Sequence, residues 1–302
     1  MVLRRLLPKI HQDDADSVEG VKQDGRKEPH LPDAKEQEKI YRTVLKKLSP
    51  WEVTMRTIDL GAEKLKPGEQ YADQANPALG LRGLRFCMRE KEIFTAQLTA
   101  LLKASREGHL NICFPMVSSL DEFHRAKKMV LDLKAKLKRK GLQVADSIRL
   151  GVMIETPAAV MEMDLLAKEA DFFSVGTNDL IQYLLAVDRT NELVSYLYTP
   201  MHPSVIRVLK QITDVAARHG KEVTLCGEMA ADPMTLLLVM ALGFTRLSMN
   251  AASIPRIKKL IRMTTMEEAK RLLQKVLAGT SSRDNQRVIQ NHMLDHFPEY
   301  FQ

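Results

Sequence analysis

The chain has 302 residues, of which 45% are hydrophobic and 27% charged. This is the composition of a globular protein, and no apolar run approaches the about 20 residues that span a bilayer. The formal net charge is +7 and only 5% of the residues are aromatic. Because these aromatic residues are not interleaved with the basic ones, a nucleic-acid-binding protein is not predicted. Because the apolar runs are too short, a membrane protein is not predicted either.

Three cysteines, Cys87, Cys113 and Cys226, show no C-x-x-C spacing. This pattern excludes a disulfide framework and a cysteine zinc site. Free cysteines are typical of a reducing compartment, so the sequence predicts a cytoplasmic protein.

The first predicted segment is a polar leader over residues 1–31, in which charges of both signs and few large apolar side chains indicate disorder. From residue 32 to residue 280, helical patterns alternate with short apolar runs. This alternation predicts a parallel α/β fold, a (β/α)8 barrel of the TIM type. Residues 281–302 form a tail with a short helical pattern and no assignable chemistry.

Seven short apolar runs are the predicted strands, whereas a closed barrel of this type needs about eight. Several are apolar throughout, as expected of parallel strands that are covered on both faces. Either one strand is hidden in the sequence or one is missing. In chain order the runs are residues 53–58, 79–85, 111–116, 149–154, 171–175, 222–226 and 245–249.

Three predicted helices between and after these strands carry signals at their ends. Ser119 and Glu122 form a capping box at the start of one helix, and Gly141 stands where a left-handed C-cap ends it. Two more helices are expected over residues 203–219 and 265–278, each followed by a glycine.

Glu155 and Asp179 follow two adjacent predicted strands. Chemistry in this kind of barrel takes place at the carboxyl ends of the strands. Two carboxylates there, with Asn178 beside one of them, are oxygen ligands of the kind that Mg²⁺ uses together with substrate phosphate and water. The alternative is that Asp179 only caps the following helix and Glu155 pairs with a basic neighbour. The spacing leaves both interpretations open.

Arg56, Arg82 and Arg189 are candidate anion-binding residues, because the guanidinium fork matches phosphate and carboxylate oxygens. Arg56 and Arg82 lie on predicted strands, where an arginine that points into a barrel mouth needs an anionic partner. Arg189 directly follows Asp188, so a surface ion pair between the two is the simpler interpretation of Arg189 taken alone.

Cys226 follows a predicted strand and precedes Gly227. A thiol in this position can act as a general acid or a nucleophile, although most such cysteines are only small buried side chains. His202 is equally ambiguous. The chain has no H-E-x-x-H, P-loop or G-x-G-x-x-G motif, so a zinc site of that type and nucleotide binding are not predicted.

Eight motifs occur in order along the chain: Arg56-Thr57-x-Asp59, Asn76-Pro77-x-Leu79-Gly80-x-Arg82, Phe114-Pro115-Met116, the nine residues 151–159, the eight residues 173–180, Ala186-Val187-Asp188-Arg189, the five residues 226–230 and the five residues 247–251. With them, residues 32–262 closely resemble the C-terminal phosphoenolpyruvate-binding barrel of enzyme I, the phosphoenolpyruvate–protein phosphotransferase of bacterial phosphotransferase systems. Residues 247–251 look more like its nitrogen-regulatory branch than its sugar-transport branch.

The resemblance implies a Mg²⁺ cofactor held by Glu155 and Asp179. It also implies that Cys226 exchanges the proton at the methylene carbon of the enolpyruvate leaving group. The residues that it places around phosphoenolpyruvate are Arg56, Arg82, Asn178, Asp179 and Arg189. The phosphoryl group would pass to a histidine on a separate domain and then to a histidine-containing phosphocarrier protein, and the family forms homodimers through this barrel.

Two departures from the family pattern bear on function. None of the eight histidines lies in a Gly-Gly-x-x-Ser-His-like motif, and residues 1–31 lack the Arg-Thr-Glu of the first barrel strand. The chain is therefore predicted to bind phosphoenolpyruvate and Mg²⁺ but to be an incomplete enzyme without the histidine domain. The alternatives are a non-catalytic binding or interaction module, and the barrel of a relative of pyruvate phosphate dikinase or phosphoenolpyruvate synthase.

Overall fold

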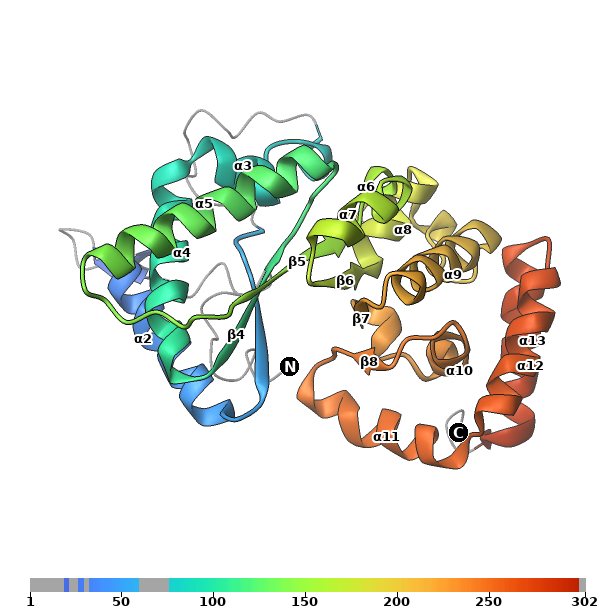
Figure 1. The fold of residues 1–302 in the computed structure, drawn as a ribbon. Helices are drawn as coiled ribbons and strands as arrows, with labels where there is room; N and C mark the ends of the chain where they lie inside the picture. Colours follow the sequence, from blue (N-terminus) through green and yellow to red (C-terminus); the bar gives the residue numbers. More distant parts are fainter. Residues whose placement is uncertain (1–18, 22–26, 30–32, 60–75, 299–302) are drawn as a thin grey trace. The chain divides into compact units, whose positions relative to one another are not determined.

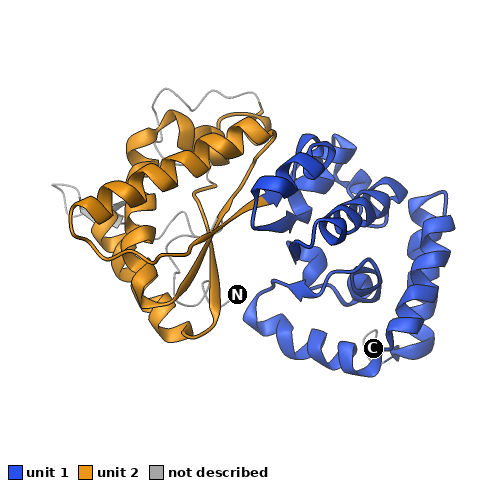
Figure 2. Ribbon diagram, in the orientation of Figure 1, with its two compact units in different colours: residues 1, 153–302 blue, residues 2–152 orange. Residues whose placement is uncertain are grey.

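A computed structural model of the protein describes residues 19–21, 27–29, 33–59 and 76–298 (Figure 1). Most of the predicted leader, residues 1–31, lies outside the described residues. The chain divides into two compact units (Figure 2), which we call the N-terminal unit, residues 2–152, and the C-terminal unit, residues 153–302. The boundary falls inside one strand, the predicted strand 149–154.

The N-terminal unit combines three parallel strands with helices, and it also holds a short antiparallel hairpin formed by its first two strands. Its elements are β1 (Glu19–Val21), β2 (Lys27–Pro29), α2 (Ala34–Leu48), β3 (Glu52–Arg56), η3 (Pro77–Leu79), α3 (Gly83–Arg89), α4 (Lys91–Ala104), η4 (Ser105–Glu107), β4 (His109–Phe114), α5 (Leu120–Arg139) and β5 (Arg149–Ile154).

The C-terminal unit alternates strands and helices and then ends in three consecutive helices (orange to red in Figure 1). Its elements are α6 (Pro157–Met161), α7 (Met163–Glu169), β6 (Phe172–Gly176), α8 (Thr177–Leu185), η5 (Ser195–Leu197), α9 (Pro203–Arg218), β7 (Glu222–Cys226), η6 (Glu228–Ala230), α10 (Pro233–Ala241), β8 (Arg246–Leu247), η7 (Ala251–Ser253), α11 (Ile254–Met263), α12 (Met266–Ala278) and α13 (Ser282–His296).

The strands pair in chain order, β3-β4-β5-β6-β7-β8, in a six-stranded sheet. The pairs β3–β4, β4–β5, β6–β7 and β7–β8 are parallel. The predicted α/β class is confirmed, because helices follow these strands along the chain. The predicted eight-stranded closure is not shown: the described parts of the chain contain six strands of this sheet.

Six of the seven predicted strands are confirmed, two of them with unchanged bounds, residues 149–154 and 222–226. In β4 and β5 every residue after the first is buried, which is the pattern expected of parallel strands covered on both faces. The last predicted strand, residues 245–249, is shorter than expected and spans Arg246–Leu247.

The prediction of a strand over residues 79–85 is wrong. Leu79, the first residue of the predicted strand, is the last residue of the 3-10 helix η3, and helix α3 begins at Gly83. Gly83 has a φ of +56°, which a strand does not accommodate, and a Cβ there would lie 2.6 Å from Cγ of Met116. The apolar run instead contributes Leu84 to the buried face of α3.

The predicted helix ends are largely confirmed. The Ser119 side chain accepts a hydrogen bond from the backbone N–H of Glu122 at 3.3 Å, and Gly141 has the left-handed φ of +76°. The Glu122 carboxylate accepts from the N–H of Ser118 at 2.6 Å, one residue before the position that a capping box uses. Along the described residues, no helix is both long and apolar enough to cross a membrane.

Candidate functional site

The two predicted metal ligands lie in the C-terminal unit, at the ends of neighbouring strands. Glu155 directly follows β5, and its side chain is so close to Gly176, the last residue of β6, that a Cβ there would overlap its Oε2 atom. Asp179 lies in the first turn of α8, which continues from β6. Both are buried, with 1% of Glu155 and 9% of Asp179 exposed. Asp179 is therefore not the helix cap of the simpler interpretation, since Gly176 holds that position.

Asn178 is held in one orientation by Glu228. Its Oδ1 accepts a hydrogen bond from the backbone N–H of Glu228 at 3.0 Å, and its Nδ2 donates to Oε1 of Glu228 at 3.4 Å. The backbone before Glu228 can come this close to Asn178 only because residue 227 is glycine. Its φ is +96°, and a Cβ there would lie 2.8 Å from Oδ1 of Asn178. The amide is thus fixed by the loop that follows β7.

Arg189 faces the same residues. Its Nη1 lies 3.9 Å from Oε1 of Glu228, and its backbone N–H donates to the Gln182 side chain at 3.2 Å. Asp188, the partner expected from the sequence, instead accepts hydrogen bonds from the N–H and hydroxyl of Thr190, which lower the pKa of its carboxyl.

Tyr198 is a residue of this site that the sequence analysis missed. Its hydroxyl donates to the backbone carbonyl of Asn178 at 3.3 Å. Burial raises the pKa of Tyr198 to about 12; the charges of Glu228 and Asp179 add to the rise and that of Arg189 opposes it. The phenol therefore stays protonated at neutral pH and remains a hydrogen-bond donor. Among the six tyrosines, nothing in the sequence around Tyr198 marks it out.

Cys226 ends β7 beside this group. Its thiol donates to the backbone carbonyl of Val175 at 3.0 Å and lies 3.4 Å from the hydroxyl of Ser174. The carbonyl of Cys226 accepts from the hydroxyl of Thr177 at 3.0 Å. Thr177 in turn precedes Asn178, so Cys226 is tied by hydrogen bonds to the turn that carries Asn178 and Asp179. Cys226 is partly exposed.

Two of the predicted arginines lie in the N-terminal unit, around one buried carboxylate. Arg82 donates from Nε to Oδ1 of Asp59 at 3.2 Å and from Nη2 to Oδ2 at 2.9 Å. Arg56 places Nη1 3.5 Å from the same Oδ2. Asp59 is 5% exposed. The anionic partner that arginines in such a position need is therefore supplied by the chain itself, and two positive charges converge on one negative charge.

The structure thus brings the predicted site residues together in two groups. The C-terminal unit holds Glu155, Asn178, Asp179, Arg189 and Cys226, to which it adds Thr177, Tyr198 and Glu228. The N-terminal unit holds Arg56 and Arg82, to which it adds Asp59. His202, ambiguous in the sequence, caps α9 by accepting at Nδ1 from the N–H of Ser204 at 3.2 Å.

We expect an alkylating reagent to modify Cys226 alone in the folded chain. Cys87 and Cys113 are buried, whereas Cys226 is partly exposed. Burial raises the pKa of the Cys87 thiol to about 12, and the Asp59 carboxylate adds to the rise, so this thiol stays protonated and unreactive. Peptide mass spectrometry after iodoacetamide treatment should find one modified cysteine before unfolding and all three after it. Modification of Cys87 in the folded chain would contradict this burial.

Sequence comparison finds close relatives among curated proteins. The chain is 46% identical over 258 residues to the phosphoenolpyruvate-protein phosphotransferase of a Bacillus species (strain S), and this match covers 85% of the chain and 44% of the relative. It is 42% identical over 266 residues to the protein of the same name from Listeria monocytogenes, with 88% and 46% covered. The chain therefore spans less than half the length of these relatives.

Structure comparison finds weaker likenesses. A citrate lyase from Burkholderia xenovorans superposes with a TM-score of 0.46 at 15% identity, covering 88% of the chain and 90% of the lyase. The malate synthase of Haloferax volcanii, solved as a magnesium and glyoxylate complex, gives a TM-score of 0.48 at 13% identity, with 89% and 76% covered.

The family assignment rests on the match of residues 25–266 to the phosphoenolpyruvate-binding domain of phosphoenolpyruvate-utilising enzymes. This range contains every site residue described above, in both units, and it takes in the resemblance seen in the sequence. The chain belongs to the family of phosphoenolpyruvate-utilising enzymes, and residues 25–266 are its phosphoenolpyruvate-binding domain.

Proposed function

We propose that the chain binds phosphoenolpyruvate together with Mg²⁺ and is the phosphoenolpyruvate-binding portion of a phosphoenolpyruvate–protein phosphotransferase. The observation that carries the proposal is the close packing of the buried Glu155 on Gly176, the residue that leads into the turn bearing Asn178 and Asp179. It places two carboxylates at the same end of adjacent strands, where this fold class binds its ligands.

The donor set suits Mg²⁺. Glu155 and Asp179 are hard oxygen ligands, and sites of this kind use one or two carboxylates and leave the other positions to substrate phosphate and water. The chemistry that Mg²⁺ supplies when bound is charge neutralisation at the phosphate oxygens.

The remaining residues receive roles that match their chemistry. Arg189 pairs with the carboxylate or phosphate of the substrate, and Asn178 offers an amide whose orientation Glu228 holds. Arg56 and Arg82 are also proposed to bind phosphoenolpyruvate. Support for these two is the resemblance of their motifs to those of enzyme I.

Cys226 is the proposed proton donor. When the phosphoryl group leaves, the P–O bond of phosphoenolpyruvate breaks and a P–N bond forms to a histidine of a separate domain. The enolate that remains takes the Cys226 proton at its methylene carbon and becomes pyruvate. The phosphohistidine would then serve a histidine-containing phosphocarrier protein. In such a transfer, charge neutralisation and alignment carry most of the catalysis.

The wider setting of the chain is also a proposal. We infer that the chain forms a homodimer. We also infer a cytoplasmic location, which the free thiols support, and a (β/α) barrel of which the six strands form the greater part. The rival to the enzymatic proposal is a non-catalytic module that binds phosphoenolpyruvate or a protein partner.

Calorimetry tests the proposal directly. Titration of phosphoenolpyruvate into the chain with Mg²⁺ should show saturable heat at millimolar concentrations or below, and EDTA should abolish it. Asp179→Asn should weaken binding at least about 100-fold, since it removes a charged ligand. The matched control is Asp164→Asn, because Asp164 is an exposed carboxylate paired with Arg218 at 3.2 Å. Equal affinity in both variants, or no heat from the unmodified chain, would refute Mg²⁺-dependent binding.

A further inference from the structure

A group of three potential ligands lies at the end of the chain, in the helical hairpin of α12 and α13. Glu268 is in the first turn of α12, and His292 and His296 are in the last turns of α13, on the same face because they are four residues apart. Two of these three residues belong to the tail with no assigned chemistry. All three lie beyond residue 266, where the family match ends.

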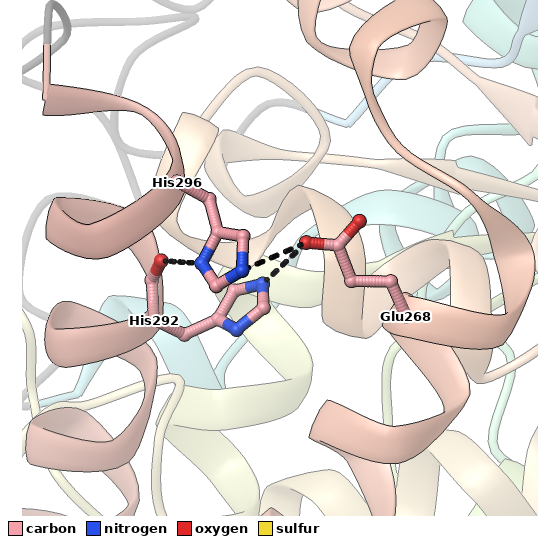
Figure 3. Close-up of side chains that lie close together, drawn as sticks. All are labelled: Glu268, His292 and His296. Atoms are coloured by element: carbon pink, nitrogen blue, oxygen red, sulfur yellow. Dashed lines mark hydrogen bonds and ion pairs between the residues drawn. The ribbon is translucent and has the colours of Figure 1, made fainter.

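The ligand atoms converge (Figure 3). Oε1 of Glu268 lies 3.1 Å from Nε2 of His292 and 3.8 Å from Nε2 of His296, and all three atoms are within 4.8 Å of one another. The two imidazole rings stack with centroids 4.3 Å apart and an interplanar angle of 21°, and both Nε2 atoms face Oε1 of Glu268. Nitrogen and oxygen ligands at about 2.1 Å from a tetrahedral zinc ion are themselves about 3.4 Å apart, and the two distances from Glu268 lie on either side of this value.

The protonation of His296 is set by the backbone. Its Nδ1 lies 2.9 Å from the carbonyl oxygen of His292, and a carbonyl can only accept, so Nδ1 carries the proton. In the neutral ring the lone pair is therefore on Nε2, which faces the Glu268 carboxylate. A histidine that donates its other N–H to a backbone carbonyl is the usual arrangement around a protein-bound metal ion.

The other two ligand atoms lack an adequate partner. Oε1 of Glu268 and Nε2 of His292 are inaccessible to solvent, and neither makes a hydrogen bond with favourable geometry to any of the described residues. With the proton on Nδ1, as in His296, the Nε2 lone pair of His292 faces the Glu268 carboxylate oxygen, and a cation between the two atoms satisfies both.

We propose that Glu268, His292 and His296 bind a divalent transition-metal ion of the Zn²⁺ type, joining the end of α13 to the start of α12. Imidazole ligands select zinc and its neighbours over magnesium, so this site is chemically distinct from the carboxylate pair of the phosphoenolpyruvate site. Three protein ligands leave the fourth position to water. His296, whose side chain is 50% exposed, lies on the side from which the ion would enter.

The test is titration of the untagged 302-residue chain with ZnCl2, followed by calorimetry. We expect one Zn²⁺ per chain with an affinity that His296→Gln and Glu268→Gln each lower by at least about 100-fold. CoCl2 should produce the visible absorption bands of low-coordinate Co²⁺, and millimolar MgCl2 should leave them unchanged. His296 is half-exposed, so its variant is expected to fold, which far-UV circular dichroism checks.

The matched control is His219→Gln. His219 pairs with Asp164 at 2.8 Å, but as a single exposed histidine–carboxylate pair without a second imidazole. The His219→Gln variant should have the same Zn²⁺ affinity and the same Co²⁺ spectrum as the unmodified chain. The proposal is overturned if the unmodified chain takes up no Zn²⁺ at micromolar concentration, or if His296→Gln binds as tightly as His219→Gln. In either case the cluster is a Glu–His contact and no metal site.

Discussion

Replacing Cys226 by alanine should slow the exchange of the methyl hydrogens of pyruvate with solvent by about 10²–10⁴-fold, the range that a positioned general acid or base contributes. The expected loss follows from the placement of the thiol: it ends β7, donates to the Val175 carbonyl at 3.0 Å and is partly exposed. Proton NMR in D₂O, with Mg²⁺ and the chain present, measures the exchange without the histidine domain.

The affinity for phosphoenolpyruvate separates a chemical role of Cys226 from a structural one. Calorimetry should find it nearly unchanged in Cys226→Ala, because the proton moves only after the P–O bond has broken. Cys226→Ser is the control for shape: it keeps a hydrogen-bond donor of similar size but is a far weaker acid, so exchange should stay slow. Exchange at the unmodified rate in the alanine variant would show that another group carries the proton.

Replacing Arg82 by methionine should lower the free energy of unfolding by about 3–5 kcal/mol, the usual result of removing one partner from a buried ion pair. The Asp59 side chain is 0% exposed and receives two hydrogen bonds from Arg82. After the substitution its remaining ion-pair contact is Arg56 at 3.5 Å, whose own side chain is 39% exposed. Urea unfolding followed by circular dichroism measures the change.

Arg218→Met is the matched control for this stability change. Arg218 also pairs with an aspartate, Asp164, at 3.2 Å, but the two side chains are 62% and 53% exposed. Surface pairs of this kind contribute about 0–1 kcal/mol. Arg82→Lys should fall between the two, because it keeps the charge and loses the two-point contact. If Arg82→Met and Arg218→Met lowered the free energy of unfolding equally, the burial of Asp59 would not be the reason for the contribution of Arg82 to stability.

The strands were predictable because their signal is local. A strand that is buried on both faces must be apolar nearly throughout, and β4 and β5 show this in five consecutive buried residues. The start of α5 also has a local signal. The Ser119 side chain accepts a hydrogen bond from the backbone N–H of Glu122, only three residues later. The failure at residues 79–85 has a local cause as well: the apolar residues there alternate with glycines, and Gly83 takes a φ of +56° that starts a helix instead.

The contacts of the candidate site residues could not be predicted from the sequence. The motifs identified Arg82 and Arg189 as anion-binding candidates, yet Arg82 binds Asp59, 23 residues away, and Arg189 faces Glu228 instead of its neighbour Asp188. Tyr198 has no motif around it, and its proximity to Asn178 arises only because the chain returns there after α8. The contact between Glu268 and His292 likewise depends on how α13 folds back on α12.

The sequence by itself determined the family, the α/β class and the approximate position of six strands, since these depend on residue identity and on periodicity over a few neighbours. Only the tertiary structure decided which charges meet, which glycines allow two loops to touch and which imidazoles face a carboxylate. The physical reason is range. Contacts of about 3 Å form between residues far apart in the chain, and their geometry is set by the packing of all the elements between them.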